Sequence, residues 1–174
     1  MKTLRAPRYL TRVILFCCVT PTIALAAQAG SQAASTLYKD ECASCHMAYP
    51  AELLPARSWQ AILGNLDKHF GDNASLDTAT QQKLLQYLQA NSADAADTRL
   101  AQRLLRSIPA DTTPLRISET AYIRRKHDEI PARYITANPQ VKSLSNCVAC
   151  HQGAEKGAFN EHQVRIPGYG QWDD

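Results

Sequence analysis

Two copies of the pattern Cys-x-x-Cys-His are the residues of this sequence whose spacing most clearly indicates chemistry. They are Cys42, Cys45 and His46 in the first copy, and Cys147, Cys150 and His151 in the second. This spacing is the attachment signature of haem c. The two thiols lie where they can form thioethers with the two vinyl groups on one edge of a porphyrin, and the next histidine can bind iron from below the ring. The pattern predicts two covalently bound haem c groups, each with its motif histidine as proximal ligand.

Other uses of a cysteine pair are weaker explanations. A single Cys-x-x-Cys pair can be a thioredoxin-like redox site or half of a zinc site, and four cysteines in an oxidising compartment can form two disulfides. Beyond residue 29 the chain has four cysteines, all in the two motifs, and a histidine follows each pair. A zinc site with four cysteine ligands would have to draw on both halves of the chain. A zinc site with two cysteine and two histidine ligands would need a spare histidine beside each motif. Haem is therefore the favoured prediction.

The candidates for the sixth ligand of each iron can be narrowed by elimination. Methionine is a common distal ligand and raises the potential, but Met47 directly follows His46 and cannot reach the opposite face of the same haem. The free histidines are His69, His127 and His162. We expect His69 to serve the first haem, since it lies where small one-haem cytochromes supply their distal ligand. For the second haem we expect His127, with His162 as the alternative.

Two histidines on each iron would have consequences for function. Imidazole donates more strongly than a thioether, so both potentials should be low, and filled coordination leaves no place for a substrate. The sequence thus predicts an electron carrier and not an enzyme. The alternative is a diheme peroxidase or a small haem reductase with one open coordination site. A haem-based sensor module ranks last, because no output domain accompanies the motifs. Carbon monoxide binding would separate the carrier from the others.

The N-terminus has the pattern of an export signal. Its basic residues are Lys2, Arg5, Arg8 and Arg12. They precede an apolar stretch at residues 13–26 that is short for a membrane span of about 20 residues. We expect cleavage near residues 27–30 and a soluble, monomeric protein in the periplasm, with an uncleaved anchor as the alternative. Removing the signal leaves 15 basic and 16 acidic residues, and nothing favours nucleic-acid binding.

The elements that must position the motifs are mainly helical. Apolar periodicity and capping residues predict helices over residues 35–42, 59–70, a segment capped by Asp77, 98–107 and 118–127. His69 ends the second of these and His127 the last, which Ser118 can cap. No segment alternates as a strand should. Tyr49 should lie against the first haem, either between the haems or as plain packing, and Trp59 should be a core residue.

The chain resembles the small diheme cytochrome c family often called DHC. The resemblance is carried by residues 41–50, 53–55, 58–59, 69–71, 76–77, 87–88, 116–119, 126–130, 146–151, 154–155, 157, 159 and 164–167. It implies a mainly α fold, with a signal peptide at residues 1–29, an N-terminal domain like a class I one-haem cytochrome c at 30–95, and an irregular, helix-poor C-terminal haem domain at 96–174. It also implies a low-potential electron carrier. The partners it implies are a membrane b-type cytochrome or quinol pool as donor and a small oxygen-binding c-type haem protein as acceptor.

Overall fold

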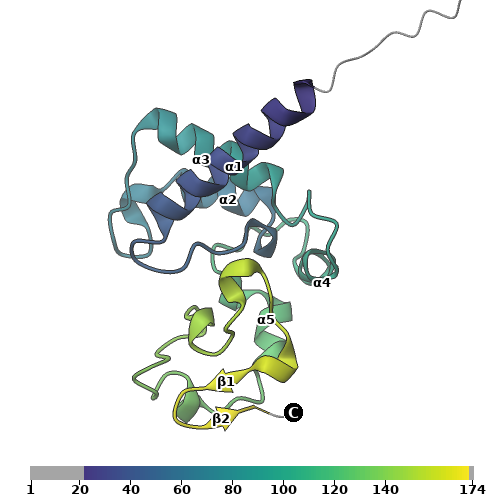
Figure 1. Cartoon of the computed structure of the whole chain (residues 1–174). Helices are drawn as coiled ribbons and strands as arrows, with labels where there is room; N and C mark the ends of the chain where they lie inside the picture. The colour runs from purple at the N-terminus through teal and green to yellow at the C-terminus, as the bar shows by residue number, and fades with distance from the viewer. Residues whose placement is uncertain (1–21, 173–174) are drawn as a thin grey trace, which may run out of the picture.

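The computed structural model describes residues 22–172 and is mainly helical (Figure 1). Its longer elements are α1 (Thr22–Cys42), α2 (Ala56–Leu63), α3 (Thr78–Ala90), α4 (Arg99–Ser107), α5 (Ala121–Lys126), β1 (Arg165–Ile166) and β2 (Gly170–Gln171). Short 3-10 turns connect them. Within residues 22–172 no helix is long and apolar enough to cross a bilayer. Most of the expected export signal, with its basic residues, lies outside the described residues, and α1 continues through residues 27–30.

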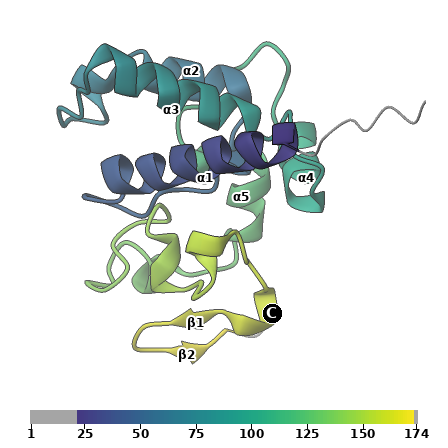
Figure 2. The same ribbon diagram turned by 45° about the horizontal axis from the view of Figure 1, so that its top comes forward.

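The first half of the chain forms a layer of three helices, in which α3 packs against both α1 and α2 (Figures 1 and 2). Its core consists of Tyr38, Ala51, Leu54, Trp59, Leu63, Leu84 and Leu88. The expected cap of α3 is confirmed, because the carboxylate of Asp77 accepts hydrogen bonds from the backbone N–H groups of Ala79 and Thr80. Trp59 is a core residue as expected, and its indole N–H donates to the carbonyl of Ala51 at 2.8 Å.

The prediction of one continuous helix over residues 59–70 is wrong. Helix α2 ends at Leu63 and is followed by Gly64, one of the weakest helix formers. A separate 3-10 turn then covers Leu66–Lys68. Phe70, expected on the buried face, is 45% exposed and has a φ of +54°. The apolar spacing persists through the break, but the chain turns, so that His69 lies in a loop and not on a helix.

The second half contains α4, α5 and a short β-hairpin. The cap at Thr98 holds the start of α4, whose Ala101 N–H donates to the threonine hydroxyl at 3.1 Å. The prediction that a helix begins at Ser118 is wrong. Residues Ile117–Glu119 form a 3-10 turn, and α5 begins only after Thr120, whose hydroxyl donates to the carbonyl of Ile117 and does not cap the helix.

The C-terminal tail is less irregular than its composition indicates. Strands β1 and β2 pair antiparallel, with Arg165 opposite Gln171. The expectation that no strand would form is therefore wrong. The turn between them includes Gly168 at a φ of +77°, a conformation that glycine adopts without the steric cost that a Cβ would bring. A hairpin this short is not visible as alternation, because each strand has only two residues.

The two halves of the chain share packing and hydrogen bonds. Leu53 of the first half lies in a buried cluster with Leu104 of α4 and Tyr122 of α5. The guanidinium of Arg57 donates to the carbonyl of Thr112 at 2.6 Å and to that of Pro109 at 3.1 Å. The division into domains at residues 95 and 96 stays a prediction, but the segments on either side of it are in direct contact.

Candidate functional site

The first motif brings the rings of two histidines close together. His46 follows the end of α1, and His69 follows the 3-10 turn Leu66–Lys68. Their ring centres are 6.0 Å apart and their planes are inclined by 24°. The Nδ1 atom of His46 lies 2.7 Å from the carbonyl oxygen of Met47. This hydrogen bond fixes the ring and leaves Nε2 available as a metal ligand, as is usual for metal-bound histidines.

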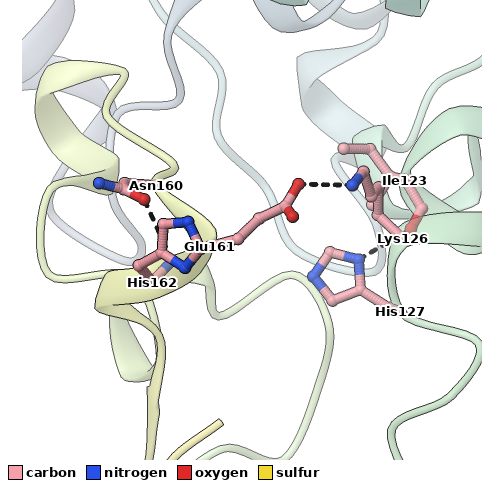
Figure 3. A network of polar contacts seen from close by, with 6 residues as sticks. All are labelled: Ile123, Lys126, His127, Asn160, Glu161 and His162. Carbon is pink, nitrogen blue, oxygen red and sulfur yellow. Dashed lines mark hydrogen bonds and ion pairs between the residues drawn. The ribbon is translucent and has the colours of Figure 1, made fainter. Parts of the chain in front are cut away.

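The second motif has the same arrangement with a different relative orientation of the rings. His127, at the C-terminal end of α5, has its ring centre 6.1 Å from that of His151, with the planes at 73°. The Nδ1 atom of His127 is 2.8 Å from the carbonyl oxygen of Ile123, the contact drawn beside Lys126 in Figure 3. His151 is held by backbone pairing with Val164 and by an edge contact with Phe159 at 5.5 Å.

These two spacings fit a metal held between imidazoles. A metal–nitrogen bond of about 2 Å on each side, plus about 1 Å from nitrogen to ring centre, places two ring centres about 6 Å apart. The second site also has free space beside it, a cavity of about 440 Å³ that includes His127 in its wall. Ile130, Ile135 and Leu144 line the same cavity. The residues present therefore fit a haem group at each motif.

The electrostatics favour neutral imidazoles that can bind iron. Burial lowers the pKa of His69 below its usual value; His46 and Arg116 lower it further, although Asp72 opposes them. Burial, followed by the proximity of His127, likewise lowers the pKa of His151. A neutral imidazole keeps the lone pair that a metal needs. Both rings are thus in the ligand form at neutral pH.

The motif cysteines lack the features of the alternative sites. All four are free of disulfides. Burial raises the pKa of Cys42 to about 11 and raises the pKa values of Cys147 and Cys150, whereas reactive redox thiols have a lowered pKa. Among residues 22–172, no three histidine, cysteine or acidic side chains gather as a metal cluster would require. The raised pKa values weigh against a redox dithiol.

The alternative ligand His162 lies in a turn at the surface. It belongs to the 3-10 turn Glu161–Gln163, is exposed, and its backbone N–H donates to the side chain of Asn160. In Figure 3 the carboxylate of Glu161 reaches from this turn to Lys126, next to His127. His151 thus has His127 as its neighbouring imidazole. Met47, excluded by the sequence argument, is buried.

Two further residues join the motif segments. The ring of Tyr49 lies 4.9 Å from that of His46, and its hydroxyl donates to the carbonyl of Ser145 at 2.7 Å, two residues before Cys147. Burial raises the pKa of Tyr49 to about 12, so it stays a hydrogen-bond donor. The sequence placed Tyr49 at the first motif but did not reveal its partner. Arg116 contacts Phe70; residues 116–119 are among the segments that resemble the family, but no role of Arg116 was predicted from the sequence.

Paired imidazoles beside two Cys-x-x-Cys-His motifs, on a mainly helical chain, define a c-type cytochrome with two haems. Residues 38–159 match the dihaem cytochrome c family, DHC, and the chain belongs to that family. It carries two covalently bound haem c groups.

Solved structures agree with this assignment. A diheme cytochrome c from Shewanella baltica is 46% identical, with a TM-score of 0.67 over 80% of this chain and 98% of that one. A diheme cytochrome c from Rhodobacter sphaeroides is 49% identical, with a TM-score of 0.64 over 71% of this chain and 95% of that one. No protein with curated functional information matches the chain. The family supports an electron-transfer role and does not favour the peroxidase or reductase alternative.

Proposed function

We propose that the protein is a periplasmic, low-potential electron carrier in which two histidines hold each iron. The pairs are His46 with His69 and His127 with His151. The observation that carries this proposal is the spacing of the ring centres, 6.0 Å and 6.1 Å, which suits one metal between two imidazoles. When bound, each haem accepts and releases one electron. The protein itself binds the groups, keeps both axial positions filled and excludes other ligands.

The hydrogen bonds behind the ligands favour a low potential. The Nδ1 atoms of His46 and His127 each face a backbone carbonyl. Donating that proton makes the imidazole a stronger donor to the metal. Stronger donation stabilises ferric iron, so the potentials should lie below those of cytochromes with a methionine ligand.

The partners we propose are redox proteins. The donor is a membrane b-type cytochrome or the quinol pool, and the acceptor is a small oxygen-binding c-type haem protein. This proposal is supported by the family, whose general role is electron transfer. Two histidines on each iron, as proposed above, would suit transfer between proteins better than catalysis. Stopped-flow reduction of such an acceptor by the ferrous protein, at several salt concentrations, would test it.

Ligand removal tests the assignment of the irons. We expect the wild type to be low-spin and to bind no carbon monoxide when reduced. His69→Ala and His127→Ala should each open one iron, giving one carbon monoxide per protein and high-spin absorption from half of the haem. His162→Ala is the matched control and should leave both haems low-spin. Carbon monoxide binding by the wild type would instead support a peroxidase or reductase, and opening by His162→Ala would reassign the second distal ligand.

A further inference from the structure

A cation from the second half of the chain lies against the loop that carries His69. The guanidinium carbon of Arg116 is 4.1 Å from the centre of the Phe70 ring. The Phe70 ring in turn makes an edge contact with the His69 ring, with centres 4.8 Å apart. Arg116, Phe70 and His69 are therefore in contact one after another. Within the loop, the N–H of Asp72 donates to the carbonyl of His69 at 3.1 Å, while Phe70 itself is 45% exposed and has a positive φ.

The segment that carries Arg116 is anchored to both halves of the molecule. Ile117 packs against the core of the first half and against the cluster around Leu104. The hydroxyl of Ser118 lies 3.3 Å from that of Ser145, close to the second motif. Glu119 forms an ion pair with Arg116 at 3.5 Å. The position of the guanidinium is thus set by contacts outside the His69 loop.

We propose that Arg116 is a positioning residue for the first haem: its contact with Phe70 holds the His69 loop, and its charge favours the ferrous state of the iron that His69 binds. The proposal rests on the proposed function, because it takes His69 as an iron ligand. Ferric iron carries one more positive charge than ferrous iron, so a nearby cation disfavours the ferric form. The step concerned is the gain of one electron from the redox partner, with no bond made or broken. The second half of the chain would then set the potential of the first haem.

Charge variants provide the test. In Arg116→Gln the positive charge is lost, and the equilibrium constant for reducing the first haem should fall roughly three- to tenfold. Arg116→Lys keeps the charge and should retain most of the wild-type equilibrium constant. Glu119→Gln removes the carboxylate that offsets Arg116 and should shift the constant in the opposite direction. Arg99→Gln, at an exposed arginine of α4, is the control and should change neither haem.

The readout is a redox titration followed by NMR, in which protons of the thioether-linked cysteines assign the signals to each haem. Phe70→Leu separates the two roles: it should alter the spectroscopic signature of the His46–His69 haem while Arg116 still supplies its charge. An unchanged constant in Arg116→Gln, an equal shift of both haems, or a shift reproduced in full by Phe70→Leu would overturn the charge role. The wild-type carbon monoxide test bears on the proposed function alone, so the two can fail separately.

Discussion

Substitution of Leu104 should weaken the packing that holds α5 and, with it, His127 at the end of this helix. Leu104 is fully buried and packs with Leu53 and Tyr122. Leu104→Ala removes the equivalent of three buried carbon groups, about 2 kcal/mol in transfer free energy. The cavity left behind adds to this, for a total loss of about 3 kcal/mol in the free energy of unfolding.

Equilibrium urea unfolding, followed through haem absorption, measures this loss. With a slope of about 1.5 kcal/mol per M, the midpoint should fall by about 2 M. Leu115→Ala is the matched control, because Leu115 is 45% exposed, and it should cost no more than about 0.5 kcal/mol. A fall below about 0.5 M for Leu104→Ala would refute the reasoning that this cluster joins the halves energetically.

Three further predictions concern the sites and their scaffold. The ferric protein should give two different low-spin EPR signals. Imidazole planes inclined by 24° split the energies of the iron orbitals with which they interact. Planes at 73° leave these orbitals nearly degenerate and give a larger anisotropy of the g values. Two identical signals would contradict these angles. Hydrogen bonds from Thr80 and Ala79 hold the pKa of Asp77 below its usual value of 3.8. Asp77→Ala should therefore lower the melting temperature at neutral pH, and the difference from wild type should vanish as pH falls through the lowered pKa; a difference that persists in acid would argue against the cap. Trp59→Phe removes the indole donor from the buried carbonyl of Ala51 and leaves it only the longer hydrogen bond from the N–H of Leu54 at 3.4 Å. It should cost about 1 kcal/mol by thermal unfolding, and a change below about 0.5 kcal/mol would count against the indole hydrogen bond.

Much of the helical scaffold could be predicted because its signals are local. Asp77 was recognisable as a cap, and the structure has α3 after it. The helix predicted over residues 98–107 is present as α4. The burial of Trp59 followed from its place in an apolar pattern. The Cys-x-x-Cys-His motifs indicated two covalent haems because the spacing itself encodes the attachment chemistry. In each of these cases the relevant residues lie within a few positions of one another.

The features that were missed depend on distant parts of the chain. The break after Leu63 in the helix predicted over residues 59–70 is an exception, because Gly64 is a local signal for it. Tyr49 finds Ser145 across 96 positions, and Arg116 finds Phe70 across the boundary between halves. The assignment of His127 rather than His162 stays a prediction, although the structure places His127 beside His151. No local pattern identifies such pairs, because they form only when the halves pack.

The proposed iron ligands share a feature that explains why this packing matters for function. His46 follows α1, His69 lies in a loop, and His127 stands at the end of α5. A side chain at the end of an element is not fixed by the hydrogen bonds of a helix interior, so its direction depends on what touches it. Some of those contacts are local, since the Nδ1 atoms of His46 and His127 face the carbonyls of Met47 and Ile123. Others come from distant segments: Arg116 contacts Phe70 next to His69, and the Leu104 cluster packs against α5. The spacing of the imidazoles, and with it the proposed ligation of the irons, therefore depends on packing between the two halves as well as on the residues around each motif.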